Sequence, residues 1–252
     1  MSVLKDLVRL GYSRSWVVDK YATVGLWPSE DWACTTFWPA GSRILDLGCG
    51  AGRTTIPLAQ KAYQITGADL ALPMVHKAYQ QAKTWHVNAT WAVVDGTDLP
   101  FSEGSFAGVL FSYNGIELVP RTEGKSRVLS EAWRVLKPGG HLIFTTHALE
   151  AFNQYLPIRL RRLVRFLYLR ARRKPMPEME VGEVIHDSRK NFEVYYMQII
   201  SPRTYRKLLA QTGFELVYYN SRQRLESGKS PSWYTDFDAD FKFYVAQKPA
   251  LQ

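Results

Sequence analysis

The chain has 252 residues, of which 46% are hydrophobic and 22% charged, and its formal net charge is +9. This length can bury a sizeable core and favours one α/β domain with an insertion. No stretch approaches 18 uncharged apolar residues, and the start lacks a basic segment followed by an apolar one. Two cysteines make neither a disulfide framework nor a zinc site. We therefore expect a cytoplasmic protein with reduced thiols and no bound metal.

Aromatic residues are concentrated near the start, between residues 15 and 38, and include Trp16, Tyr21 and Trp27. Large rings more often pack helices onto a sheet than contact a ligand, because they bury much apolar area. We expect residues 1–41 to form a helical cap on the domain.

The most informative stretch follows, from Arg43 to Arg53, and reads RILDLGCGAGR. An apolar strand ends beside Asp46, glycines occupy alternate positions, and a helix is expected from Thr54 to Ala62. Glycine admits positive φ angles and lets a ligand approach the main chain, and the helix N-terminus offers unpaired N–H groups to a carboxylate. A dinucleotide fingerprint needs Gly or Ala where Arg53 stands, and the lysine of a P-loop is absent. The turn therefore predicts a ligand site of another type.

Two more predicted strands lead into acidic residues. Gln64–Asp69 is expected as the second strand, and the Asp69 carboxylate has two acceptor oxygens for the hydroxyls of a ribose. The third strand, Thr90–Val94, leads into the sequence DGTDLPF at residues 95–101. Open α/β sheets bind ligands beyond the carboxyl ends of their strands, so these acids are expected at one site.

The remaining strands of the first half follow at regular spacing. Residues 105–114 are expected as the fourth strand, a helix runs from Glu123 to Leu136, and residues 142–146 are expected as the fifth strand. Between this helix and the fifth strand, the proline and glycines of residues 137–140 stop the helix.

Together these motifs resemble the class I (Rossmann-like) methyltransferases that use S-adenosylmethionine (SAM). The run DLGCGAG resembles their motif I, DGTDLPF resembles the segment that meets the adenine, and LKPGG resembles their signature before strand five. The pattern looks most like the subgroup that methylates small molecules, including ubiquinone precursors. The resemblance implies an α/β fold with a seven-stranded doubly wound sheet of order 3-2-1-4-5-7-6, strand 7 antiparallel, and a helical insertion after strand 5.

The resemblance also implies SAM as cofactor, S-adenosylhomocysteine (SAH) as product and no metal. The residues that it places at the cofactor follow the first four strands: Asp46, Gly48, Cys49, Gly50, Asp69, Leu70, Met74, Asp95, Gly96, Thr97 and Ser112.

The whole chain, 1–252, is expected to be one methyltransferase domain. The cap of residues 1–41 precedes a cofactor-binding core at 42–148, and a basic helical lid is expected at 149–198. Residues 199–252 carry a helix and strands six and seven, with the polar and aromatic stretch 221–240 as a hairpin loop near the rim.

The charge of the chain is concentrated in one segment. Residues 159–174 hold seven arginines, one lysine and no acid, so they account for +8 of the net charge of +9. At helical spacing they place five apolar residues on one stripe: Leu160, Leu163, Val164, Leu167 and Ala171. Such a helix suits a lid over a substrate pocket, peripheral contact with an anionic membrane, or RNA or another anion. The additional apolar residues Phe166, Tyr168 and Leu169 favour a membrane or an apolar substrate over nucleic acid.

The chemistry requires little from side chains, because a sulfonium is an activated methyl donor and orientation supplies roughly 7–11 kcal/mol in favourable cases. A base is needed only where the nucleophile starts protonated. The candidates follow strands four and five: Tyr113, Asn114, Glu117 and His147. We favour His147, with Tyr113 second, because a neutral imidazole accepts a proton near pH 7. His186 and Asp187 in the insertion are a further option.

Three functions remain open. The sequence after strand four, Ser112 to Gly115, lacks the [DN]-P-P-[YF] motif of enzymes that methylate nucleobase amines, so we expect a small apolar or amphiphilic acceptor methylated on oxygen or carbon. The second possible function is that of a tRNA or protein methyltransferase whose basic helix holds an acidic partner. The third is a SAM-binding module without transfer activity. The oligomeric state is not indicated.

Overall fold

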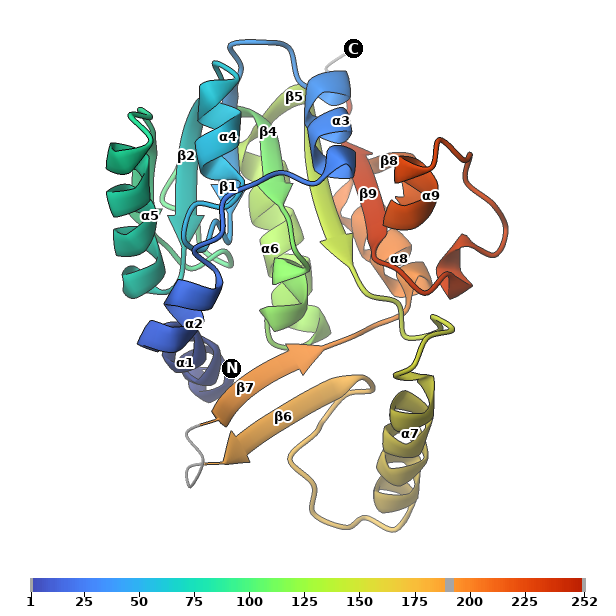
Figure 1. Ribbon diagram of the computed structural model, residues 1–252. Helices are drawn as coiled ribbons and strands as arrows, with labels where there is room; N and C mark the ends of the chain where they lie inside the picture. Colours follow the sequence, from blue (N-terminus) through green and yellow to red (C-terminus); the bar gives the residue numbers. More distant parts are fainter. Residues whose placement is uncertain (1, 189–192, 251–252) are drawn as a thin grey trace.

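The computed structural model describes residues 2–188 and 193–250. Its centre is a seven-stranded sheet in the order β3-β2-β1-β4-β5-β9-β8 (Figure 1). The strands are β1 (Arg43–Leu47), β2 (Gln64–Asp69), β3 (Thr90–Val93), β4 (Phe106–Phe111), β5 (Leu136–Thr146), β8 (Glu215–Ser221) and β9 (Lys242–Gln247). Counted along the chain within this sheet, the order is 3-2-1-4-5-7-6, and the last strand is antiparallel to both neighbours. The predicted fold is confirmed.

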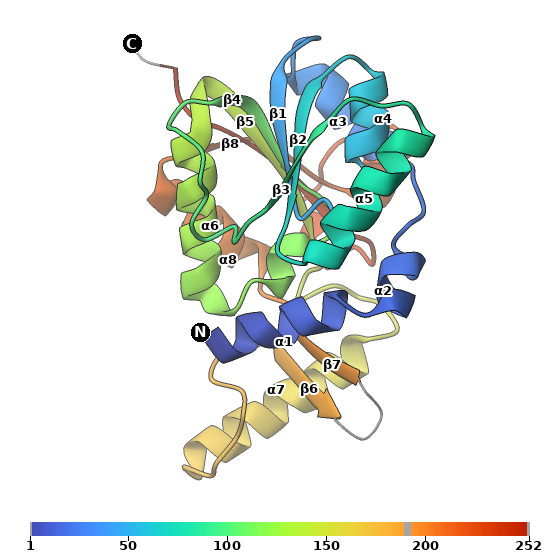
Figure 2. The ribbon, with the colours of Figure 1, turned by 90° about the vertical axis from the view of Figure 1, so that its left-hand side faces the viewer.

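Helices cover both faces of the sheet, which explains why the parallel strands are nearly continuous apolar runs. The helices are α3 (Pro28–Phe37), α4 (Thr55–Gln60), α5 (Leu72–Thr84), α6 (Arg121–Val135) and α8 (Pro202–Thr212). Figure 2 shows α3, α4 and α5 on one face and α6 and α8 on the other. Ile44 of β1 pairs with Ile65 of β2 and Gly108 of β4, so these parallel strands end at one edge.

Several element boundaries differ from the prediction. Strand β5 begins at Leu136, directly after α6, where residues 137–140 were expected only to stop the helix. Leu136 pairs with Phe106, and the register then shifts before His141 pairs with Gly108, so the glycines lie in an irregularity of the sheet. Residues 221–240 are not a plain hairpin loop, because they contain α9 (Arg222–Glu226) and the 3-10 helix η2 (Thr235–Phe237).

The N-terminal segment, for which a helical cap was predicted, holds α1 (Ser2–Tyr12) and α2 (Ser15–Lys20) ahead of α3. Helix α1 lies between the carboxyl edge of the sheet and a two-stranded hairpin from the insertion (Figure 2). Leu4 and Val8 pack there against the buried ring of Tyr196. The cap therefore joins the core to the insertion.

The insertion is only partly helical, which corrects the prediction. It holds α7 (Leu156–Ala171), but also an antiparallel hairpin of β6 (Glu183–Ser188) and β7 (Glu193–Gln198). The segment Glu193–Gln198 is rich in β-branched and aromatic residues, which favour strands. Within the described ranges, no helix has the length and apolar character needed to cross a bilayer.

Most of the apolar stripe of α7 does not pack against the protein. Phe166 is the buried side chain of this helix, whereas Leu160, Val164 and Leu167 are 52%, 65% and 52% exposed. At 100° per residue, Phe166 lies well away from Val164 around the helix axis, so both cannot face the core. Leu160, Val164 and Leu167 therefore point away from the protein, whereas the half-buried Leu163 lies beside Phe166 in the wall of one pocket.

Candidate cofactor and acceptor site

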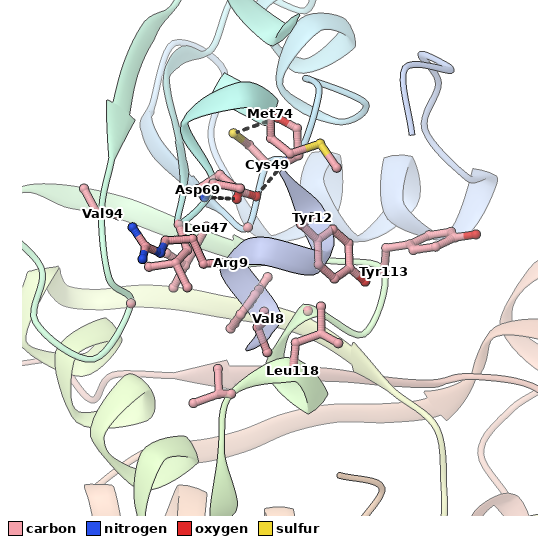
Figure 3. A pocket seen from close by; sticks show the side chains of 18 of the residues that line it. Val8, Arg9, Tyr12, Leu47, Cys49, Asp69, Met74, Val94, Tyr113 and Leu118 are labelled. Carbon is pink, nitrogen blue, oxygen red and sulfur yellow. Dashed lines mark hydrogen bonds between the residues drawn. The ribbon is translucent and has the colours of Figure 1, made fainter. Parts of the chain in front are cut away.

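A cavity opens at the carboxyl edge of the sheet, below β1, β2 and β4 and against α1. It encloses about 1100 Å³ of space between atoms, part of it open to solvent. In Figure 3 the side chains of Tyr12, Val94 and Met74 lie around Asp69, and Tyr113 extends away from it. The cavity thus lies where parallel α/β sheets bind ligands.

In the loop after β1, main-chain atoms without side chains line this cavity. Gly48 has φ +69°, and a Cβ there would lie 2.7 Å from the ring of Phe111, so a larger residue does not fit. Gly50 has φ +54°, and its N–H donates to Asp69 at 2.9 Å. Both conformations suit glycine, and they leave room for a ligand close to the main chain.

Asp46 was predicted as a cofactor contact, but the structure does not bring it to the cavity wall. Its carboxylate is buried and accepts hydrogen bonds from the hydroxyls of Thr54 and Thr55, both at 2.6 Å. Burial raises the pKa of Asp46 to about 6, against the opposing effect of these two hydrogen bonds. Asp46 therefore fixes the start of α4, which directly follows the glycine loop.

Asp69 occupies the end of β2 as predicted. One of its oxygens accepts the N–H of Gly50 at 2.9 Å, and the other accepts the N–H of Ala71 at 2.8 Å. Burial raises the pKa of Asp69, and these N–H groups partly offset that rise. The two N–H groups hold the carboxylate in place. Each carboxylate oxygen still has a free lone pair, so together they can accept hydrogen bonds from two hydroxyls.

Asp95 and Thr97 mark the far end of the cavity. Asp95 accepts hydrogen bonds from the backbone and hydroxyl of Thr97, at 2.9 and 2.7 Å. Lys5 of α1 reaches the same carboxylate at 2.5 Å and the Thr97 hydroxyl at 2.7 Å. Although burial opposes it, the hydrogen bonds from Lys5 and Thr97 lower the pKa of Asp95.

The cavity gathers most of the predicted cofactor residues. Those that line it are Gly48, Cys49, Gly50, Asp69, Leu70, Met74, Asp95, Gly96, Thr97 and Ser112, together with Tyr113. Neither Asp46 nor His147 is among the lining residues. The insertion contributes none of its described residues, so α1 and not α7 forms the rim here.

Sequence reasoning missed the contribution of α1. Lys5, Val8, Arg9 and Tyr12 of this helix line the cavity. Their spacing of three and four residues is the pattern of one helix face, but nothing in that pattern tells which surface the face meets.

Arg53, which stands where a dinucleotide fingerprint needs Gly or Ala, was not predicted as a site residue, although it lines the cavity. Its guanidinium forms an ion pair with the fully buried Glu30 of α3, and donates to Ser112 at 3.0 Å and to the carbonyl of Gly25 at 2.8 Å. The Ser112 hydroxyl donates to Glu30. This network ties α3 to the loops after β1 and β4.

Strained backbone marks the end of β4. Tyr113 and Asn114 have φ +50° and +61°, a region that costs non-glycine residues energy and is enriched at functional sites. The conformation leaves Tyr113 45% exposed at the cavity. Its ring lies 5.2 Å from that of Trp27 and 6.4 Å from that of Phe241, as measured between centroids.

His147 lies at the other end of these rings, 4.8 Å from Phe241. Its Nδ1 lies 2.7 Å from the carboxylate of Glu117, which is fully buried and also accepts the His147 backbone N–H at 2.6 Å. With the tautomer that donates from Nδ1, Nε2 is the basic atom. A carboxylate that orients an imidazole in this way is the arrangement of a general base.

The second predicted base, in the insertion, is not at the cavity. His186 lies on β6 and is not among the lining residues, and the side chain of Asp187 lies outside the described part of the chain. Among the residues that the structure describes, no group of three or more His, Cys, Asp or Glu side chains could hold a metal ion.

The cavity fits SAM by the chemistry of its walls. Asp69 would hold the ribose hydroxyls, and the glycine loop leaves space for the aminoacyl tail. Val94, Leu118 and Met74 supply apolar surface for a flat base, with the polar groups of Thr97 and Asp95 at the edge of that surface. A methyl donor bound in this manner would face Tyr113 and the strained end of β4.

Comparisons with known proteins agree with this geometry. Residues 44–140 match the protein family described as "Methyltransferase domain". The demethylmenaquinone methyltransferase of Tropheryma whipplei is 36% identical over 104 residues, which are 41% of this chain and 41% of that protein. The match thus spans less than half the length of this curated relative.

Solved structures support the fold over most of the chain. A SAM-dependent methyltransferase from Methanosarcina mazei is similar with a TM-score of 0.68 and 23% identity, covering 90% of this chain and 100% of the other. The [4+2]-cyclase SpnF is similar with a TM-score of 0.59 and 17% identity, covering 88% and 80%. A fold of this kind therefore serves more than one reaction, and function has to be argued from the site.

Three independent findings converge: the family match over residues 44–140, the strand order, and a cavity lined by the glycine loop and Asp69. Residues 44–140 thus match the methyltransferase-domain family, and the chain has the fold of SAM-dependent methyltransferases.

Proposed function

We propose that the protein transfers a methyl group from SAM to a small amphiphilic acceptor with an aromatic, hydroxyl-bearing ring, such as a quinol. The observation that carries the proposal is the row of aromatic rings from the cavity to the His147–Glu117 pair. Tyr113 lies at the cavity, Phe241 beside it, and His147 beyond Phe241. A flat apolar ring stacks favourably on such a surface.

The residues of the cavity bind and orient the donor. When bound, SAM supplies a methyl group on a positively charged sulfur. Asp69 holds the ribose, and the Arg53–Glu30 ion pair keeps α3 and the ends of β1 and β4 in fixed positions around the reaction space. Positioning of two reactants in this way removes much of the barrier without covalent help from the protein.

His147 would accept the proton of the acceptor hydroxyl at Nε2, while Glu117 orients the ring and stabilises the imidazolium that forms. An ionised quinol hydroxyl directs electron density to its oxygen and to the ring carbons beside it, so its deprotonation prepares both O- and C-methylation. In C-methylation the proton of the methylated ring carbon is then released to solvent, which restores the aromatic ring. Imidazole bases of this kind typically contribute 10²–10⁴-fold to a rate.

The relatives favour this acceptor class. The curated protein from Tropheryma whipplei is named a demethylmenaquinone methyltransferase, and another, 33% identical over 108 residues, from Desulfotalea psychrophila, is named a ubiquinone/menaquinone biosynthesis C-methyltransferase. Both matches cover about two fifths of the chain, which leaves the acceptor as a proposal.

The test is a methyl-transfer assay with SAM labelled in its methyl group. The protein is incubated with separate lipid, RNA and protein fractions of a lysate, and with demethylated quinols as defined acceptors. We expect label in the lipid-extractable fraction and on the quinol. Label in RNA or protein would instead support a macromolecular acceptor, and SAM binding without transfer to any fraction would support a binding module.

A further inference from the structure

Helix α7 is the outermost element beyond the carboxyl edge of the sheet (Figures 1 and 2). It is fixed to the protein on one side, through the buried ring of Phe166 and the side chain of Arg159. Arg159 donates to the carbonyls of Leu149, at 3.1 Å, and Ala151. The helix therefore has a defined inner face.

Its outer face carries an apolar stripe, which we call the outer stripe: Leu160, Val164 and Leu167. These residues recur at intervals of four and three, so they lie along one line of the helix, and each is at least half exposed. Tyr168, 52% exposed, lies beside them. The protein buries Phe166 and leaves this stripe to water, so the stripe does not serve the packing of the domain.

Arginines border the outer stripe. Arg161 and Arg172 follow the stripe on the side of Tyr168, and the Arg172 guanidinium lies 5.8 Å from the centre of the Tyr168 ring. Within residues 2–188 and 193–250, neither arginine has an ion-pair partner, whereas Arg165 pairs with Glu178 at 2.8 Å. The segment as a whole holds +8 without an acid.

A cluster of exposed aromatic rings includes Phe152, which precedes the N-terminal end of α7. Phe152, four residues before the helix, stacks on Phe237 with ring centres 5.5 Å apart. Trp233 is 87% exposed and, like Tyr234, lines the same surface pocket as Phe152 and Phe237. Tryptophan and tyrosine favour the boundary between water and lipid.

We propose that α7 binds the surface of a bilayer rich in anionic lipids, lying in the membrane plane with the outer stripe in the apolar layer. Arginines beside an apolar stripe match an interfacial helix, because the guanidinium groups meet lipid phosphates while the stem and stripe enter the acyl region. Nucleic acid does not match a face whose centre is apolar. A second copy would bring two segments of +8 together. The proposal does not rest on the methyl-transfer activity.

The test is sedimentation of the full chain with vesicles of phosphatidylcholine and phosphatidylglycerol, compared with phosphatidylcholine alone. We expect binding to the anionic vesicles that weakens with salt. Each basic residue near the surface changes partitioning about fivefold, so R161Q with R172Q should weaken binding by about 25-fold. A matched control, K83Q with K137Q, removes two exposed charges from the opposite end of the molecule and should leave binding nearly unchanged.

A second variant separates lipid insertion from charge attraction. L160S, V164S and L167S together keep every charge and change side chains that are already exposed, so the fold and SAH affinity should be retained while vesicle binding is lost. The proposal is overturned if wild-type protein ignores anionic vesicles at low salt, or if the two charge variants weaken binding equally. It is also overturned if the serine variant binds as wild type, or if the stripe proves to hold a dimer or to bind RNA in preference to vesicles.

Discussion

Replacement of Asp69 by alanine should weaken cofactor binding by a predictable amount. The carboxylate oxygens already accept the N–H groups of Gly50 and Ala71, at 2.9 and 2.8 Å, and each retains acceptor capacity toward the cavity. A hydrogen bond to a charged group contributes about 1.5–3 kcal/mol. Loss of the ribose contact should therefore raise the dissociation constant of SAH about 10- to 150-fold.

The same substitution also removes the support of the Gly50 N–H, so the ribose contact has to be separated from a loosened loop. We suggest calorimetry with SAH and with 2′-deoxy-SAH, which lacks one hydroxyl. Wild-type protein should bind the deoxy compound at least tenfold more weakly, while D69A should bind both compounds with similar affinity.

Two results would refute this reasoning. If D69A loses the same factor for SAH and for the deoxy compound, Asp69 acts only through the loop. If D69A binds SAH as tightly as the wild type, Asp69 lies outside the cofactor site, and the placement of the ribose is wrong.

Further predictions concern the base, the cap and the buried acid. H147A should lower kcat about 10²- to 10⁴-fold and leave the SAM dissociation constant unchanged, because His147 does not line the cavity; a change in affinity measured by calorimetry would contradict this. K5A removes the partly exposed ion pair to Asp95, worth at most about 1 kcal/mol, so stopped-flow release of SAH should become up to about fivefold faster with little change in Tm. The pKa of Asp46 is raised to about 6, so between about pH 4 and 6 Asp46 is protonated in the folded chain and ionised in the unfolded chain. Its contribution to the free energy of unfolding therefore falls as pH rises through that window, by on the order of 3 kcal/mol. D46N should therefore gain about that much free energy of unfolding relative to wild type between pH 4 and pH 7 in urea titrations, and a constant difference would be evidence against the raised pKa.

The local sequence was sufficient for the parts of the site that lie within one strand and the turn after it. Gly48 and Gly50 are needed because the backbone itself takes positive φ angles there, and Asp69 ends a strand whose carboxyl end faces the ligand edge. These requirements act over a few residues, so they can be recognised in the amino-acid sequence. The parallel direction of the first five strands follows from the repeated pattern of strand and helix, whereas their order in the sheet was implied by the resemblance to the methyltransferases.

Contacts between side chains that lie far apart in the chain depend on the tertiary structure alone. Lys5 meets Asp95 across 90 positions, and Glu117 meets His147 across 30. Charge or chemistry marks such residues as candidates, but no periodicity states which of them come together. Their pairing depends on how α1 and the turn after β4 pack.

Helix α7 shows the same division most clearly. Its sequence determined that it is a helix with an apolar stripe and a basic border, because amphipathic spacing is a local property. Which side faces the protein depended on the carbonyls of Leu149 and Ala151, which bind Arg159, and on the space that receives Phe166. An amphipathic pattern does not specify what the apolar stripe contacts. In the fold, the face of α7 that carries Phe166 packs against the protein instead.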